Sequence, residues 1–229
     1  KDKYIIDLFC GCGGFAEGFE RSGYQSYLSA DFDYWACETF KSRFKKSKVI
    51  NEDITSDKFK AILKKQTKGV KIEGVVAGLP CQSFSSVGRA QDKFSMAKDK
   101  RNYFYKDFFE CLKIIKPNFF VFENVRGILS AKPNGVKIFD NILELSKKLG
   151  YVTLDDTSKM VFDTSEYGVP QTRKRVFVIG VKKKYSKLIP KIYEDLINVQ
   201  KDKNKYTVKD AISDLPSLKP GEGTDKVKL

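Results

Sequence analysis

Short apolar runs alternate with segments of helical periodicity along most of this chain. The apolar runs lie at residues 4–9, 25–30, 49–50, 74–77 and 119–122. Strands that alternate with helices of such lengths form βαβ units around a parallel sheet. Later strand-like segments at 151–162 and 175–181 favour an antiparallel hairpin beside that sheet. We therefore predict a doubly wound, mostly parallel α/β fold of the Rossmann-like type.

The composition restricts the partners and the chemistry of the chain. Lys and Arg outnumber Asp and Glu by 43 to 29, a net charge of +14. This charge favours a polyanionic partner, although a Lys-rich surface also serves solubility alone. Histidine is absent, which excludes histidine bases and zinc sites that need imidazole, and we predict no metal. The sequence shows neither an apolar stretch of ~20 residues nor a signal peptide, so we expect a cytoplasmic protein without a membrane partner.

A glycine-rich turn follows the first apolar run. The pattern Gly11-x-Gly13-x-x-Ala16 nearly fits the dinucleotide-binding fingerprint, in which glycines admit a ligand close to the backbone and a helix N-terminus offers free amides. Asp31, about twenty residues later, is placed to hold a ribose. Asp53 could accept a hydrogen bond from an adenine amino group or cap a helix. The pattern suits NAD, FAD or S-adenosylmethionine equally well, and a purely structural turn would look the same.

Cys81 is the candidate nucleophile. It follows the apolar run 74–77 and a proline, at the predicted carboxyl end of a central strand, where open α/β sheets bind ligands. The other four cysteines lie in or beside apolar patterns, which favours a structural role for them: Cys10, Cys12, Cys37 and Cys111. To form its thiolate without a histidine base, Cys81 would need nearby positive charge or backbone dipoles that stabilise the anion. The alternative is transfer of the thiol proton to the substrate or to water.

Two further polar groups lie at the ends of later strands. Glu123 and Asn124 follow the apolar run that begins at residue 119. Arg173 and Arg175 occupy alternate positions at the start of a predicted strand, and therefore share one of its faces. Guanidinium groups suit the recognition of carbonyl or phosphate groups. The alternative interpretation of Glu123 is an exposed loop acid, and that of the two arginines is a solvated charge run.

Four motifs together resemble those of bacterial-type cytosine-5 DNA methyltransferases. They are Asp7-Leu-Phe-Cys-Gly-Cys-Gly-Gly, Pro80-Cys81-Gln82, Glu123-Asn124-Val125 and Gln171-x-Arg173-x-Arg175. They occur in the family's order over residues 4–181. The resemblance implies the fold of S-adenosylmethionine-dependent methyltransferases and a DNA (cytosine-5-)-methyltransferase activity on duplex DNA, in a bacterial restriction–modification context at the nucleoid.

The resemblance also implies roles for the motif residues. The Cys81 thiolate adds to carbon-6 of a flipped cytosine, and Glu123 donates a proton or hydrogen bond at ring N3. Asn124 orients the pocket, Arg175 contacts the cytosine carbonyl, and Arg173 supports the site. The segment 82–100, rich in Ser, Gly and Lys, is the predicted lid. The residues expected to contact DNA are Gln82, Ser85 and Arg89.

For the cofactor, the resemblance implies a binding site for S-adenosylmethionine around the glycine turn. The residues expected to form it are Phe9, Gly11, Gly13, Gly14, Asp31, Phe32, Asp53, Ile54 and Phe104. Asp31 would hold the ribose hydroxyls, Phe32 would stack on the adenine, and Phe104 would close the pocket. Asp31 stands where many relatives have a glutamate.

We expect residues 1–182 to form the catalytic and cofactor-binding domain. Residues 183–229 are predicted to form a basic linker and a short helix leading toward a target-recognition region that this sequence lacks, together with the family's last motif. Either a second polypeptide carries these parts, or the sequence represents part of a longer enzyme. The DNA sequence recognised cannot be inferred.

Three other functions remain open from the sequence. The first is a tRNA cytosine-5 methyltransferase of the same family. The second is a nicotinamide-dependent oxidoreductase on the same glycine turn, which would leave Cys81, Glu123 and the two arginines without a joint role. The third is a catalytically silent DNA-binding subunit, against which the presence of Cys81 and Glu123 argues.

Overall fold

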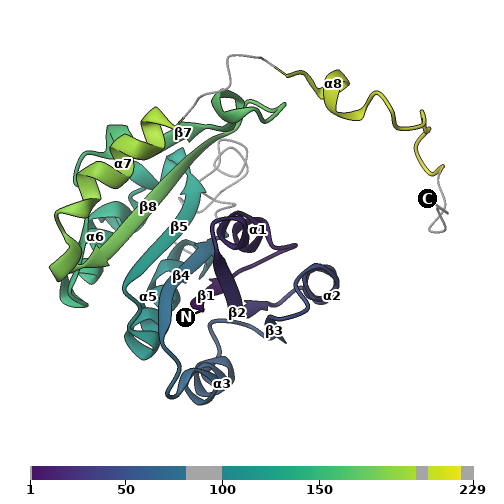
Figure 1. The fold of residues 1–229 in the computed structure, drawn as a ribbon. Coiled ribbons are helices and arrows are strands. Elements are labelled where there is room, and N and C mark those ends of the chain that lie inside the picture. The colour runs from purple at the N-terminus through teal and green to yellow at the C-terminus, as the bar shows by residue number, and fades with distance from the viewer. Residues whose placement is uncertain (1, 81–99, 200–205, 223–229) are drawn as a thin grey trace.

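The computed structural model describes residues 2–80, 100–199 and 206–222. In this part of the chain the strands form one eight-stranded sheet in the order β3-β2-β1-β4-β5-β8-β6, with β7 also paired to β8 (Figure 1). The strands are β1 (Lys3–Leu8), β2 (Tyr24–Asp31), β3 (Lys48–Asn51), β4 (Ile72–Gly78), β5 (Phe119–Val125), β6 (Tyr151–Thr153), β7 (Val161–Asp163) and β8 (Lys174–Lys182). Strands β1 to β5 pair in parallel, whereas β8 runs antiparallel to β5, β6 and β7. This confirms the predicted sheet.

Helices cover both faces of the sheet (Figure 1). One face carries α1 (Gly14–Arg21), α2 (Tyr34–Arg43) and α7 (Leu188–Asn198), and the other carries α3 (Asp57–Thr67), α5 (Phe104–Ile115) and α6 (Ile138–Lys148). Parallel strands need helices on both sides because their apolar side chains point both ways. The short helix α8 (Val208–Ile212) lies apart from the sheet, and its side chains are exposed (Figure 1).

The main core lies between the sheet and helices α3, α5 and α6. The Phe108 ring of α5 meets the rings of Phe120 and Phe122 edge to face, with centroids 5.8 and 5.6 Å apart. Gly180 on β8 pairs with Phe120, and a Cβ atom on this glycine would lie 2.2 Å from the Phe120 ring. The ring therefore lies across the glycine, which favours this register of β5 and β8.

The segment 151–162 forms two short strands, β6 and β7, instead of one. The chain between them makes a 3₁₀ turn over Thr157–Met160, and the Asp156 carboxylate accepts the amide of Ser158 at its start. The predicted antiparallel hairpin corresponds to β7 and β8, in which Val161 pairs with Val176. The polar residues 155–159, with the Asp156 side-chain cap among them, therefore separate the two strands.

Helix α7 packs directly on the sheet. Ile189 and Tyr193 are buried, and the Tyr193 hydroxyl donates to the Phe177 carbonyl at 2.8 Å and accepts the Ile179 amide at 3.0 Å. Residues 188–198 therefore pack with the preceding part of the chain. The domain boundary at residue 182 stays a prediction, and the packing of α7 favours a boundary after this helix.

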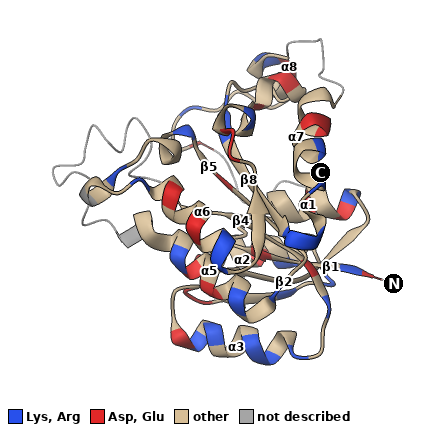
Figure 2. Cartoon of the chain, turned by 90° about the vertical axis from the view of Figure 1, so that its left-hand side faces the viewer, with Lys and Arg blue, Asp and Glu red and all other residues tan. Residues whose placement is uncertain are grey.

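Acidic and basic side chains are mixed on helices α5 and α6, whereas α3 carries four lysines and one aspartate (Figure 2). Ion pairs join Lys60 to Asp107 across α3 and α5, and Lys148 to Glu144 within α6. Lysines therefore outnumber acids on α3, whereas α5 and α6 each carry two lysines and two acids.

An open apolar groove lies on the other face, between α1 and α7. Its volume is about 760 Å³. Phe15 and Phe19 of α1 form one wall, Leu188 and Ile192 of α7 form the other, and β5 and β8 form the floor. Phe19 stacks on Phe119 at the floor, with ring centroids 6.0 Å apart. No helix in the described ranges is long and apolar enough to cross a bilayer.

Replacing Tyr193 by Phe tests the attachment of α7. The variant leaves the Ile179 amide and the Phe177 carbonyl without their partner in a buried place, so the free energy of unfolding should fall by about 1–3 kcal/mol in urea denaturation. Tyr206→Phe is the control, because Tyr206 is exposed, and it should change stability by less than about 0.5 kcal/mol. Equal effects of both substitutions would contradict the packing described for α7.

Candidate active site

The carboxyl ends of the central parallel strands meet at one edge of the sheet. Leu8 pairs with Ala30 on one side and Ala77 on the other, and Gly78 pairs with Glu123. The turn after β1, the end of β2 and the acid on β5 therefore share this edge. Open α/β sheets bind their ligands at such an edge, so the candidate site lies here.

Glu123 forms a cluster with both predicted arginines. Arg175 Nε lies 2.7 Å from Glu123 Oε1, and Arg173 Nη2 lies 3.5 Å from the same oxygen. Arg175 lies two residues before Phe177, which pairs with Glu123, so the side chains share a face of the sheet. The Glu123 and Arg175 side chains are each 19% exposed. The structure thus brings together three residues separated by fifty positions in the sequence.

Asn124 points to the opposite face and is buried. Its amide nitrogen donates to the Leu79 carbonyl at 3.5 Å, and its oxygen accepts the Val125 amide at 2.8 Å. Asn124 therefore connects the end of β5 to the segment that leads toward position 81. Cys81, Gln82, Ser85 and Arg89, together with most of the predicted lid, lie outside the described residues, and their roles stay predictions.

The turn after β1 has an unusual backbone. Phe9, Gly11 and Gly13 have φ angles of 54°, 51° and 91°. Gly13 also cannot be replaced without a clash, because a Cβ atom there would lie 2.3 Å from the Phe44 ring. Gly13 is the N-cap of α1 and supplies no side-chain cap. Within the described part of the chain, the Gly14 and Phe15 amides have no hydrogen-bond acceptor, and so remain available to a ligand.

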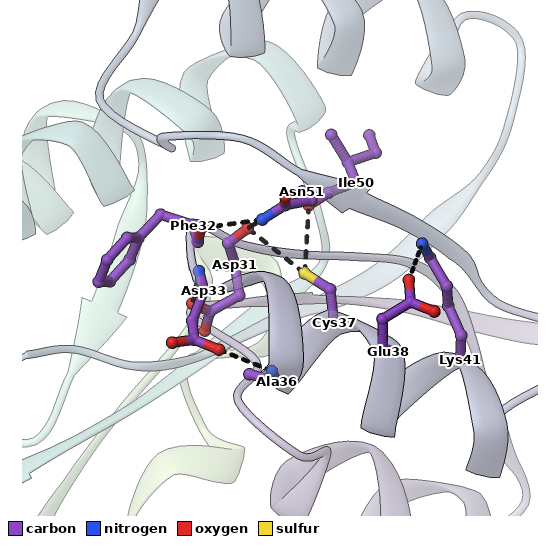
Figure 3. Close-up of polar contacts among 9 residues, drawn as sticks. All are labelled: Asp31, Phe32, Asp33, Ala36, Cys37, Glu38, Lys41, Ile50 and Asn51. Carbon is purple, nitrogen blue, oxygen red and sulfur yellow. Dashed lines mark hydrogen bonds and ion pairs between the residues drawn. The ribbon is translucent and has the colours of Figure 1, made fainter.

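Asp31 holds this turn against the end of β2. Its carboxylate accepts the Gly11 amide at 2.9 Å and the Asp33 amide at 3.0 Å, and the residue is buried. Figure 3 shows the surrounding contacts, in which Asn51 donates to the carbonyls of Asp31 and Phe32, and the Cys37 thiol donates to the Asp31 carbonyl. Sequence reasoning assigned the Asp31 carboxylate to a ribose, and in the structure it also shapes the glycine turn.

The residues predicted to contact adenine differ in their placement. The Phe32 side chain is 72% exposed and points away from the sheet (Figure 3). The Phe104 ring stacks on Phe9, with centroids 5.6 Å apart. The Asp53 carboxylate binds the amide and hydroxyl of Thr55. Ile54 is buried in the core, so only its backbone could meet an adenine.

These groups fit a nucleoside that carries a charged tail. An exposed aromatic ring, a carboxylate and two unpaired helix amides lie on adjoining strand ends, which suits an adenine, a ribose and a carboxylate. A metal is not indicated in residues 2–80, 100–199 and 206–222, where no cluster of three potential ligands occurs.

Asp7 is a site residue to which sequence reasoning gave no role. One carboxylate oxygen accepts the Ala16 amide at 3.2 Å, and the other is buried without a partner in the described structure. Burial, with a smaller contribution from the Asp31 charge, raises the pKa of Asp7 well above its usual range. The sequence feature that could have indicated Asp7 is its position as a charged residue inside the apolar run 4–9.

Replacing Asp7 by Asn should change how stability depends on pH. A raised folded-state pKa stabilises the protein below the unfolded pKa of about 4, and this contribution is lost as the pH rises through the folded pKa. Because Asn cannot ionise, the stability of the variant relative to wild type should increase between pH 5 and pH 8, by an amount of the order of 1 kcal/mol. Urea denaturation at both pH values measures it, and a constant difference would contradict a buried neutral Asp7.

The chain is similar to known proteins over most of its length. The family model of C-5 cytosine-specific DNA methylases matches residues 4–228. Among curated relatives, the Type II methyltransferase M.DdeI of Desulfomicrobium norvegicum is 39% identical over 96% of this chain and 50% of its own length. The Type II methyltransferase M.NgoPII of Neisseria gonorrhoeae is 35% identical, over 92% of this chain and 56% of its own length.

Solved structures show the same fold. A prophage-encoded protein of E. coli, described as a DNA modification methyltransferase, superposes with a TM-score of 0.69 and 30% identity, over 95% of this chain and 56% of its own. Spodoptera frugiperda DNMT2 shares the fold at 19% identity, with a TM-score of 0.59 over 80% and 50% of the two chains. The chain spans about half the length of the curated relatives named above. The family match, the motif order and the strand-edge site together show that this chain belongs to the C-5 cytosine-specific DNA methylase family.

Proposed function

We propose that this chain transfers a methyl group from S-adenosylmethionine to carbon-5 of a flipped cytosine in duplex DNA, as the catalytic part of a Type II modification enzyme. The observation that carries the proposal is the Glu123 cluster beside the strand that leads to Cys81. Glu123 pairs with Gly78, three residues before Cys81, and is held by Arg173 and Arg175. The glycine turn ends the neighbouring strand β1, on the other side of β4.

In the proposed reaction the Cys81 thiolate forms a bond to carbon-6 of the cytosine, while Glu123 supplies a proton or hydrogen bond at N3. Both arginines bind Glu123 through Oε1, which leaves Oε2 to face the base. S-adenosylmethionine, when bound, supplies the electrophilic methyl group that the activated carbon-5 attacks. Water then takes the proton from carbon-5, the bond between sulfur and carbon-6 breaks, and N3 returns its proton to Glu123, which restores the Cys81 thiolate and the aromatic ring.

Several chain residues would hold the cofactor. The exposed Phe32 ring would stack on its adenine, and the free amides of Gly14 and Phe15 would bind its carboxylate. Asp31 retains lone pairs for a ribose hydroxyl beside its two backbone contacts. The nicotinamide alternative has no use for the cluster of one acid and two arginines.

Duplex DNA is the favoured substrate over tRNA. The family model that matches the chain describes DNA methylases, and the curated relatives named above, at 39% and 35% identity, are Type II methyltransferases. The DNMT2 structure, at 19% identity, supports the fold alone. A direct comparison of duplex DNA and tRNA as methyl acceptors distinguishes the two substrates.

A duplex that contains 5-fluorocytosine should trap the proposed adduct. Fluorine at carbon-5 cannot leave as a proton does, so the bond from sulfur to carbon-6 persists after methyl transfer. We expect the wild-type chain to form a covalent complex on a denaturing gel and Cys81→Ser to form none. The same duplex with ordinary cytosine is the control. An adduct that persists in Cys81→Ser would exclude this nucleophile. Because the trapped adduct does not reverse, even a poorly active chain should accumulate it during a long incubation with excess S-adenosylmethionine, and its absence from the wild type under these conditions would favour the silent-subunit alternative.

The groove between α1 and α7 supports a further part of the proposal. A soluble protein rarely leaves so large an apolar surface uncovered. This chain matches about half of each curated relative named above. We propose that the groove binds a segment of the other half, which belongs either to the same polypeptide or to a second one. Because α1 forms one wall of the groove and also begins at the glycine turn, occupation of the groove would stabilise the cofactor site.

This arrangement predicts weak cofactor binding and poor methylation by the 229-residue chain alone. Radiolabelled methyl transfer to duplex DNA measures the activity, and calorimetry with S-adenosylhomocysteine measures the binding. Robust site-specific methylation by the isolated chain would show that no additional part is needed.

A further inference from the structure

The turn from Phe9 to Gly14 needs support from outside itself. Three of its residues adopt positive φ angles, and for Phe9, which has a Cβ atom, such a conformation is strained. A turn of this kind keeps one shape only when surrounding contacts hold it. A role of these contacts in binding S-adenosylmethionine rests on the proposed function.

Strand β2 supports the first half of the turn. The Cys10 amide donates to the Ala30 carbonyl at 3.1 Å, and the Gly11 amide donates to the Asp31 carboxylate at 2.9 Å. In both contacts, an amide group of the turn donates to a residue of β2. Neither fixes the Cys12 carbonyl, which lies between the two glycines of the fingerprint.

Helix α2 supports the second half through its last residues. The Arg43 Nη1 atom donates to the Cys12 carbonyl, and Nη2 lies 3.0 Å from Glu17 Oε2 on α1. The Arg43 guanidinium also lies over the Phe44 ring, 4.9 Å from its centroid, and Phe44 is the ring against which Gly13 packs. One planar group therefore joins α2, the glycine turn and α1.

We propose that Arg43 is a positioning residue for the cofactor turn. The Gly13 amide donates to the Cys10 carbonyl at 2.9 Å and holds one side of the peptide plane between Cys12 and Gly13. Arg43 holds the other side through the Cys12 carbonyl, and the two contacts together set the direction of the Gly14 and Phe15 amides that follow. Both nitrogens of the guanidinium group are needed, because Nη1 binds the turn and Nη2 binds α1, the helix that follows the turn. A lysine has a single ammonium group and cannot hold both partners in this planar geometry.

Calorimetric titration of the 229-residue chain with S-adenosylhomocysteine tests the proposal. Arg43→Ala should raise the dissociation constant about tenfold, the usual effect of losing one charge-assisted hydrogen bond. Arg43→Lys should recover part of the affinity, because it keeps the charge beside Glu17. Arg21→Ala is the matched control: Arg21 pairs with the other oxygen of Glu17 at 2.6 Å and, within the described part of the chain, forms no hydrogen bond or ion pair with the turn. It should leave the affinity unchanged.

Hydrogen exchange separates positioning from general stability. Amides of residues 9–16 should exchange faster in Arg43→Ala, while the melting temperatures of both alanine variants stay close to that of the wild type. Equal affinities for Arg43→Ala and wild type, or an equal loss in Arg21→Ala, would overturn the proposal. If the wild-type chain bound no S-adenosylhomocysteine even at millimolar concentration, the proposed cofactor function itself would fail, whatever the variants did.

Discussion

Parallel pairing between β4 and β5 places the acid of this protein beside the segment that leads to its candidate nucleophile. Gly78 lies opposite Glu123, so a shift of one residue in this register would turn Glu123 to the other face of the sheet. Aromatic packing opposes such a shift. Phe120 and Phe122 pack against Phe108 on one side, whereas Phe119, Val121 and Glu123 follow one another on the other side. The position of a polar group at the strand end is thus a consequence of how the apolar residues before it are packed.

The fold and the outline of the site could be predicted because they depend on local patterns. Strand–helix alternation predicts the sheet, and polar residues that directly follow apolar runs predict which groups share its edge. Glu123 met this description, whereas Arg175 was singled out at the start of a predicted strand, and the structure joins the two at 2.7 Å. The attachment of α7 was not predicted, because its charged residues obscured the two apolar positions, Ile189 and Tyr193, that pack on the sheet.

Contacts that connect distant parts of the chain could not be predicted in the same way. Arg43 reaches a carbonyl 31 positions earlier, and Asn51 holds the Phe32 carbonyl 19 positions away. Neither residue belongs to a motif, since each acts through a backbone group that any residue type would offer. Asp31 shows the converse case. Its sequence position indicated a ligand-binding acid, but the pattern could not show that its carboxylate also accepts two amides of the protein.

The reversed direction of β8 has a consequence for how such a protein can diversify. In an all-parallel sheet, the first residues of a strand lie at the edge remote from the ligand. Because β8 runs antiparallel to β5, its first residues, including Arg175, reach the same edge as Glu123. The connection between β7 and β8 therefore opens on the substrate side, while the glycine turn lies beyond β4. Under the proposed function, insertions in that connection can alter which substrate is recognised and leave the proposed methyl-donor pocket intact.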